Sequence, residues 1–337
     1  MAHPDRLALA FQTQALDLPT TGTVVVLRAM PSSFLDLVPP ERLRCVQTFR
    51  PVHDALAERG RAVSTRAEGP AAMVVVNLTR SRPENLGNIA SGLQLLSPGG
   101  RLVVTGAKSD GVDSIARQLA SLLPLEGAFV KAHGRVIWAD RPDSLPDSIA
   151  EWAKEAEPAA NADGFVTAPG MFSPDRADPG SRRLAVALTG ALSGRVAELG
   201  AGWGWLARTA LDLNPSISEI DLFEAEALAL DAARVNVRDG RATFHWTDAT
   251  GLGSGVPPYD AVITNPPFHQ GRASEPDLGA AFVVAASRIL KPNGRLMMVA
   301  NRQLPYEATV AAAFRRWENL GEDGVYKVLA AEGPRRR

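Results

Sequence analysis

The residues Asn265-Pro266-Pro267-Phe268 combine hydrogen-bonding groups, a rigid turn and an aromatic ring directly after a predicted strand over residues 259–264. The strand is short, apolar and rich in β-branched residues. Two consecutive prolines lack N–H groups and fix φ, so the chain must leave the sheet there in one direction. An amide can accept and donate hydrogen bonds, and an aromatic ring can stack on a planar group. The combination suits a planar substrate, such as a nucleobase or an amide, whose amino group is held for methylation. The alternative interpretation is a loop that happens to carry two prolines.

A glycine-rich turn is the second candidate. Glu198, Gly200, Gly202 and Gly204 follow the pattern Glu-x-Gly-x-Gly-x-Gly, between a predicted strand and a predicted helix over residues 206–213. Glycines at alternate positions let the backbone pass close to a ligand, and the helix N-terminus behind them favours anions. The spacing differs from the G-x-G-x-x-G pattern of dinucleotide-binding folds, and a purely structural tight turn is the alternative interpretation.

Acidic residues stand at the ends of the next two predicted strands. Glu224 is the last residue of the strand over residues 218–224, and Asp248 follows the strand over residues 242–246. A carboxylate about twenty residues after the glycines is the usual partner of a ribose hydroxyl pair. The alternative for Glu224 is an N-cap of the following helix, a role that Glu fills poorly. Asp248 could reach an adenine amine. The glycine turn, the two acids and the Asn-Pro-Pro turn thus follow successive strands, and open α/β sheets bind ligands at the carboxyl ends of their strands.

Three stretches of the second half resemble a known family. Residues 169–181 resemble the segment before the first helix of class I S-adenosylmethionine-dependent methyltransferases, more closely that of the bacterial small-subunit ribosomal RNA (guanine-N2) methyltransferases. Residues 265–271 resemble the family's catalytic loop. This match is specific, since glutamine and N6-adenine methyltransferases usually have Tyr after the two prolines, where this chain has Phe268. Residues 299–306 resemble its fifth strand and the turn that follows, and residues 325–328 are expected to close the sheet. The match covers roughly residues 165–331.

The resemblance implies S-adenosylmethionine as cofactor and ribosomal RNA, or the small ribosomal subunit, as partner. The residues predicted to bind the cofactor are Phe172, Glu198, Gly200, Ala201, Gly202, Gly204, Glu224, Asp248, Ala249 and Asn265. The predicted catalytic residues are Asn265, Pro266, Pro267 and Phe268, and the predicted substrate contacts are Phe268, His269 and Arg272. Glu198 stands where many members have Asp, and two bulky residues, Trp203 and Trp205, lie beside the glycine turn.

The first half repeats the second half in degraded form. A predicted strand over residues 72–77, a helix over residues 82–96 and a strand after Pro98 run parallel to the segments after Ala261. Asn77 corresponds to Asn265, but Leu-Thr replaces the two prolines, and no glycine turn follows the strand over residues 23–27. We therefore expect two tandem Rossmann-like α/β domains, each with a mostly parallel seven-stranded sheet and helices on both faces, of which only the second is active.

The predicted domains are a degenerate methyltransferase-like domain over residues 1–150, a linker over residues 151–164, a catalytic domain over residues 165–331 and a basic tail over residues 332–337. A chain of 337 residues is too long for one ordinary α/β core. In the resembling family the first copy is thought to aid folding of the second and to hold RNA. Loss of both ligand-binding turns fits such a recognition or scaffolding role.

Composition narrows the class of protein. A single cysteine, Cys45, excludes disulfides within the chain and a cysteine-based metal cluster. No apolar run is long enough to span a bilayer, and the first residues lack the pattern of a signal peptide. We therefore expect a cytoplasmic protein, a monomer without membrane or metal partners. A net charge of −1 argues against binding RNA by bulk electrostatics, although a local patch could do so. The candidate cations are Arg176, Arg182, Arg183, Arg272 and the arginines at 335–337.

Two alternative functions stay open. The same turn could serve a protein-glutamine or adenine-N6 methyltransferase, but Phe268 and the tandem architecture argue against that. A non-catalytic RNA chaperone or ribosome assembly factor would have no need of the intact glycines and Asn265 in the second copy.

Overall fold

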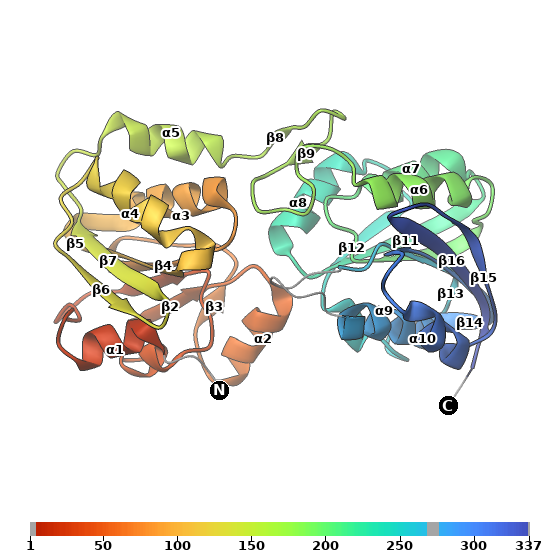
Figure 1. Ribbon diagram of the computed structural model, residues 1–337, viewed down its shortest axis with the longest axis horizontal. Helices are drawn as coiled ribbons and strands as arrows, with labels where there is room; N and C mark the ends of the chain where they lie inside the picture. Colours follow the sequence, from red (N-terminus) through yellow and green to blue (C-terminus); the bar gives the residue numbers. More distant parts are fainter. Residues whose placement is uncertain (1–4, 268–275, 336–337) are drawn as a thin grey trace. The chain divides into compact units, whose positions relative to one another are not determined.

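The computed structural model describes residues 5–267 and 276–335. The chain forms two compact units, one made of residues 1–158 and 168–170 and the other of residues 159–167 and 171–337. Each unit contains one seven-stranded sheet with helices on both faces (Figure 1). The predicted tandem α/β architecture is confirmed. Among the described residues, no helix is long and apolar enough to cross a membrane.

The first sheet has the strand order β3-β2-β1-β4-β5-β7-β6. Its strands are β1 (Val24–Leu27), β2 (Leu43–Val46), β3 (Val63–Ser64), β4 (Ala71–Asn77), β5 (Leu96–Ala107), β6 (Gly127–Lys131) and β7 (Gly134–Asp140). The helices of this unit are α1 (Arg6–Gln12), α2 (Arg50–Glu58), α3 (Arg82–Leu95), α4 (Val112–Ala120) and α5 (Asp147–Glu155), with short 3-10 helices η1 (Ser33–Asp36) and η2 (Lys108–Asp110). Strand β7 pairs antiparallel with both β5 and β6, and the other pairings of this sheet are parallel.

The second sheet repeats this order as β12-β11-β10-β13-β14-β16-β15. Its strands are β10 (Gly194–Leu199), β11 (Ile217–Glu224), β12 (Ala242–Trp246), β13 (Tyr259–Thr264), β14 (Leu290–Asn301), β15 (Phe314–Glu322) and β16 (Tyr326–Pro334). The helices are α6 (Pro179–Leu188), α7 (Trp205–Leu213), α8 (Ala227–Asn236), α9 (Pro276–Ile289) and α10 (Tyr306–Ala313), with the 3-10 helix η3 (Ala249–Gly251). A small separate sheet pairs β8 (Ala159–Ala160) with β9 (Val166–Thr167).

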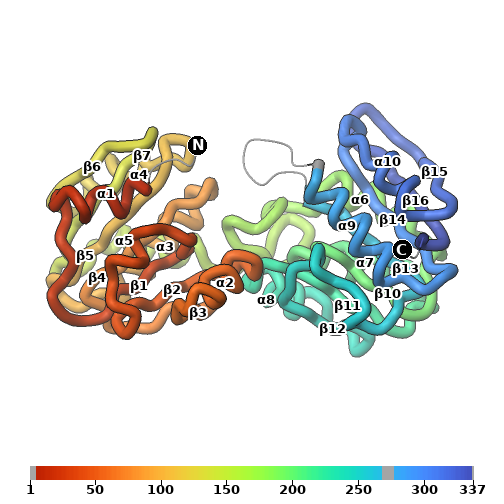
Figure 2. The backbone as a smooth tube through the Cα atoms, turned by 90° about the horizontal axis from the view of Figure 1, so that it is seen from below, coloured from red at the N-terminus to blue at the C-terminus, as the bar shows by residue number. Residues whose placement is uncertain are grey.

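Apolar strands produce the layered architecture because parallel strands in the middle of a sheet are buried on both faces. All four residues of β1 are buried, and so are four of the six residues of β10. In the second unit, α6, α7 and α8 cover one face of the sheet and α9 and α10 cover the other (Figure 1). Figure 2 looks onto the face of this sheet that α9 and α10 cover. Burial of these apolar residues stabilises each unit by about 25 cal/mol per Å².

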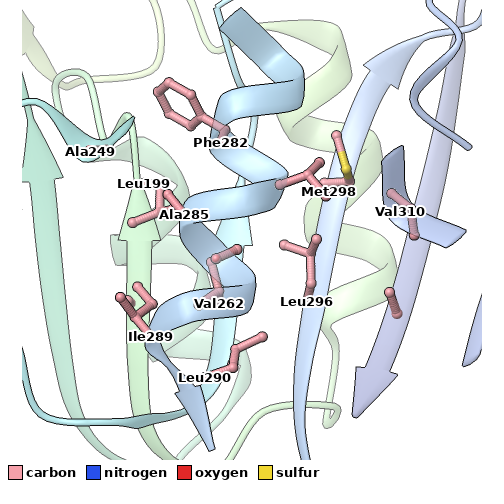
Figure 3. Close-up of a cluster of buried hydrophobic side chains, with 14 of the residues drawn as sticks. Leu199, Ala249, Val262, Phe282, Ala285, Ile289, Leu290, Leu296, Met298 and Val310 are labelled. Atoms are coloured by element: carbon pink, nitrogen blue, oxygen red, sulfur yellow. The ribbon is translucent and has the colours of Figure 1, made fainter. Parts of the chain in front are cut away.

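Helix α9 shows how the core positions the site. Phe282, Ala285 and Ile289 lie on its sheet-facing side and pack against Leu199 and Val262 (Figure 3). Leu199 is the last residue of β10, immediately before the glycine turn. The core contacts of α9 therefore fix the strand end from which that turn departs.

The structure differs from the sequence expectation at two boundaries. Ordered elements occupy much of the predicted linker over residues 151–164, because α5 continues to Glu155 and buries Trp152 in the core of the first unit. The predicted tail over residues 332–337 begins within a strand, because β16 runs to Pro334 and pairs with both β14 and β15. The buried apolar face of α5 and the strand pairing of β16 therefore extend these elements beyond the boundaries predicted from composition.

Candidate functional site

The glycine turn connects β10 to α7 with left-handed backbone. Gly200 has φ 72° and Gly204 has φ 87°, values that glycine adopts without steric cost. Gly204 is the N-cap of α7, and a Cβ there would lie 2.8 Å from the Cγ2 atom of Val237. Both geometry and packing therefore require glycine at this position. The backbone N–H groups of Gly200 and Ala201 donate to the Phe223 carbonyl, at 2.9 and 3.1 Å, which ties the turn to the end of β11.

A pocket with an empty volume of about 400 Å³, part of it open to solvent, lies at this edge. It joins the two motifs singled out in the sequence, the glycine turn and the Asn-Pro-Pro turn. Its lining residues are Phe172, Ser173, Asp178, Ser181, Glu198, Gly200, Ala201, Gly202, Trp203, Trp205, Leu206 and Asn265. Six of the ten predicted cofactor residues thus line one pocket.

Two acidic side chains lie beside the glycine turn. The Glu224 carboxylate accepts hydrogen bonds from the backbone N–H groups of Gly202 and Glu226, each at 2.7 Å. Glu198 is buried, and its Oε2 atom has no hydrogen-bond partner among the residues that the structure describes. Burial, followed by the nearby Glu224 carboxylate, holds the pKa of Glu198 well above its usual value, and burial also raises the pKa of Glu224. A positively charged ligand would relieve this cost.

Asn265 follows β13 and presents its amide to the same pocket. Its Nδ2 atom donates to Asp178 Oδ2 at 2.9 Å and to Ser181 Oγ at 2.8 Å. Its Oδ1 atom is buried and has no partner within the described part of the chain. A buried carbonyl oxygen without a partner is costly, so this atom is placed to accept a hydrogen bond from a bound molecule.

Trp203, one of the two bulky residues beside the glycine turn, holds the segment before α6 against that turn. The indole nitrogen of Trp203 donates to the Phe172 carbonyl at 2.8 Å, and its ring packs with Ala177 and Ala232. The bulk of Trp203 therefore anchors one wall of the pocket, and the Phe172 side chain is left exposed.

Several predicted residues lie elsewhere. Asp248 caps η3 by accepting from the backbone N–H of Thr250 at 2.9 Å, and neither Asp248 nor the buried Ala249 lines the pocket. Pro266 is buried and Pro267 is exposed at the start of the loop. The predicted contacts of Phe268, His269 and Arg272 lie outside the described residues.

Sequence reasoning did not identify Asp178, Ser181 or Trp203 as functional residues. The first two lie within the pre-helix segment over residues 169–181, where an Asp before Pro and a Ser three positions later is a common start of a helix. That signal predicts a cap but gives no sign of the distant Asn265. Two of the candidate RNA-binding arginines in this region are engaged in ion pairs, Arg182 with Asp163 and Arg183 with Asp323.

The corresponding edge of the sheet in the first unit carries different side chains. Arg28 follows β1 with φ 51°, and its Nε atom donates to Glu84 Oε1 at 2.7 Å. The side chains of this ion pair are only 18% and 10% exposed, so charged groups fill the place where the second unit has a glycine-lined pocket.

Comparisons with known proteins agree with this geometry. Residues 163–330 match the model of the family described as methyltransferase small domain. Ribosomal RNA small subunit methyltransferase C of Shewanella oneidensis is 30% identical over 262 residues, covering 76% of this chain and 75% of that protein. The protein of the same name from Shewanella loihica is 30% identical over 70% of this chain and 69% of its own length.

A solved structure shows the same fold over almost the whole chain. It is the T. thermophilus 16S rRNA N2 G1207 methyltransferase in complex with AdoMet and guanosine, with a TM-score of 0.79 and 24% identity, covering 98% of this chain and 91% of that one. The tandem arrangement, the pocket at the edge of the second sheet and the sequence relatives lead to one conclusion. This chain belongs to the ribosomal RNA small subunit methyltransferase C family.

Proposed function

We propose that this protein is an S-adenosylmethionine-dependent methyltransferase that transfers a methyl group to the exocyclic N2 amine of a guanosine in small-subunit ribosomal RNA. The observation that carries the proposal is the pocket that joins the glycine turn to Asn265, whose Oδ1 atom is buried without a partner among the described residues. The names of the sequence relatives and of the structural neighbour support the same reaction.

The residues of the second unit fit S-adenosylmethionine. Glycine backbone at Gly200 and Gly202 leaves room for a ligand to approach closely, and Glu224 retains acceptor capacity for ribose hydroxyls. Glu198 and Glu224, whose pKa values are raised, favour a ligand that carries positive charge. We place Phe172, Ala201 and Gly204 in the same binding role, with Asp248 and Ala249 toward the adenine. When bound, the cofactor supplies a methyl group that is already activated on a sulfonium.

The protein's own task is to hold the acceptor amine in line with that methyl group. The lone pair of guanine N2 is delocalised into the ring. Asn265 Oδ1 and the Pro266 carbonyl accept the two N2 hydrogens, which turns the lone pair toward the methyl carbon. A strong general base is not needed before transfer, because the amine becomes acidic only as the new bond forms. Phe268 is assigned to stack on the base, which must be unpaired or flipped out to enter the pocket.

The first unit is proposed to act as a scaffold and RNA-recognition module, because the ion pair of Arg28 and Glu84 fills its former ligand site. The lining of the active pocket comes from one unit of one chain, so we propose that the protein works as a monomer.

The test is transfer of a tritiated methyl group to naked 16S ribosomal RNA and to small ribosomal subunits, followed by mapping of the modified nucleoside. We expect N2-methylguanosine at one position with the wild-type protein and a strongly reduced rate of its formation with Asn265→Ala. Methyl transfer to glutamine or to adenine N6 would contradict the assignment of guanosine as the substrate. Failure of the protein to bind S-adenosylmethionine would contradict the assignment as an enzyme and favour a role as an RNA chaperone.

A further inference from the structure

The orientation of the Asn265 amide is fixed by its neighbours. Asp178 Oδ2 and Ser181 Oγ both lie within hydrogen-bond distance of Nδ2, at 2.9 and 2.8 Å. A carboxylate can only accept hydrogen bonds. If the amide were turned over, Oδ1 would face Asp178 Oδ2, and two acceptors would oppose each other. The amide therefore keeps its NH2 group toward α6 and its oxygen free for a bound molecule.

Local structure holds the Asp178 carboxylate in place before any ligand binds. Asp178 is the N-cap of α6, and its Oδ2 atom accepts from the Ser181 backbone N–H at 2.9 Å. The residue is only 8% exposed. Gly180 makes room for it, since a Cβ there would lie 2.9 Å from Oδ2. One oxygen thus caps a helix and orients an amide from a strand 87 residues away in sequence.

We propose that Asp178 and Ser181 are positioning residues that lock the Asn265 amide with its oxygen as the acceptor, so that the site takes a substrate through an N–H donor and rejects a carbonyl oxygen. The proposal rests on the proposed function and refines its substrate class. For a guanine ring, this orientation of the Asn265 amide selects the exocyclic amine over the keto oxygen. A reversed amide would offer a donor and favour the keto oxygen.

The first unit supplies a matched control. Asp5 caps α1, the helix that precedes the first strand, as Asp178 caps α6. Asp5 Oδ1 accepts from the backbone N–H groups of Leu7 and Ala8, and its Oδ2 accepts from the Ser33 hydroxyl and the Phe34 N–H. Asn77 instead donates to the Leu27 carbonyl at 3.4 Å. The helix cap is shared by the two units, whereas the link from the cap to an Asn amide is found in the second.

The experiment compares Ser181→Ala, Asp178→Ala and Asp5→Ala by the rate of methyl transfer to ribosomal RNA, the Kd of S-adenosylmethionine and the Tm. We expect Ser181→Ala to lower kcat about tenfold, because it removes one hydrogen bond to the amide and keeps the backbone N–H that the cap uses. Its Tm and cofactor Kd should be those of the wild type. Asp178→Ala should lower kcat further and also lower Tm. Asp5→Ala should lower Tm and leave kcat unchanged.

Combining the variants with Asn265→Ala separates positioning from any independent role. If Asp178 and Ser181 act through the amide, neither change should reduce the residual rate of Asn265→Ala. An unchanged kcat in Ser181→Ala, or the same fold-loss in the Asn265→Ala background, would overturn the inference. If Asp178→Ala does not fold, Ser181→Ala carries the test alone. A wild-type protein that transfers no methyl group to RNA would overturn the proposed function itself, a different outcome from variants that remain fully active.

Discussion

Arg28 in the first unit and Gly200 in the second occupy the same position, directly after the corresponding strands of two sheets with one topology and register. Both residues have left-handed backbone, with φ of 51° and 72°. At Gly200 the turn leaves space for a ligand, whereas at Arg28 a guanidinium extends into the site and pairs with Glu84. Left-handed backbone is uncommon at a residue other than glycine, and the Arg28 side chain there is held by Glu84 and by the Thr48 hydroxyl.

A second pair of matched positions shows the same replacement. Gln47 follows β2 at the register position where Glu224 ends β11. The Gln47 amide donates to the Ala29 carbonyl at 2.8 Å and accepts from the Phe49 N–H at 2.9 Å. Glu224 instead accepts from two backbone N–H groups and keeps lone pairs for further donors. The Gln47 amide is bonded to a carbonyl of the loop after β1, whereas the Glu224 carboxylate retains acceptor capacity.

The turns after β4 and β13 complete the contrast. In the first unit Leu78 packs beside Gly106, where a Cβ would lie 2.8 Å from the leucine side chain, and the Thr79 hydroxyl donates to Glu84 Oε2 at 2.8 Å. In the second unit Asn265 leaves a buried acceptor without a partner among the described residues. Buried strand residues therefore preserve the fold in both units, while a few residues at the strand ends decide whether the edge is filled by the protein's own side chains or available to a ligand.

The largest effect should come from giving the second unit the arginine of the first. Gly200→Arg places a long charged side chain into the pocket, so we expect S-adenosylmethionine binding to become undetectable by calorimetry. The reciprocal change, Arg28→Gly, should create no second binding site, because Gln47 does not replace the Glu224 carboxylate. It should instead lower the Tm, since the buried Glu84 carboxylate loses its positively charged partner. Two S-adenosylmethionine-binding sites per chain in Arg28→Gly would contradict the conclusion that the first unit cannot bind the cofactor.

The next effect concerns the two asparagines. Asn265→Ala should reduce kcat by about a hundredfold or more, because the amine is no longer held in line, while the cofactor Kd stays close to that of the wild type. Asn77→Ala should leave kcat unchanged. Single-turnover methyl transfer and calorimetry measure the two quantities. Equal damage from both substitutions would show that the assignment of one active and one inactive unit is wrong.

A smaller effect is expected at the matched acid and amide. Glu224→Ala should weaken S-adenosylmethionine binding by about 1–3 kcal/mol, the range for a hydrogen bond to a charged group at a buried site. Gln47→Ala should leave the affinity unchanged. Titration calorimetry of both variants provides the check, and an unaltered Kd in Glu224→Ala would remove that residue from the cofactor site.

The smallest effect is a dependence of cofactor affinity on pH. The pKa values of Glu198 and Glu224 lie above the ordinary 4.5, and a ligand with positive charge favours their ionised forms. Binding should therefore release protons, and affinity should rise as the pH increases through the raised pKa values. Calorimetry in buffers of different ionisation enthalpy detects the released protons, and Glu198→Gln should reduce their number. Affinity that falls as the pH rises would contradict this prediction.

The order of the candidate ligand-binding motifs along the chain could be predicted from the sequence alone. Glycines, an acid, a second acid and an Asn-Pro-Pro turn follow successive apolar strands, and the right-handed connections of a parallel sheet bring such strand ends to one edge. The repeat was equally readable, because the strand over residues 72–77, the helix over residues 82–96 and the strand after Pro98 run parallel to the segments after Ala261. In the structure α3 and α9 each have 14 residues, and β5 and β14 each have 12. Local propensity and hydrophobic periodicity suffice for these features.

Only the tertiary structure decided how the site is held together. The contact of Asp178 with Asn265 joins residues 87 positions apart, and the bond from Trp203 to the Phe172 carbonyl spans 31. The pairing of Arg28 with Glu84 spans 56. Each contact depends on the direction in which a side chain leaves its own element, which the sequence pattern does not specify. The cap at Asp178 and the turn at Asn265 each have ordinary local signals. Packing of α6 against the sheet brings the two side chains within hydrogen-bond distance.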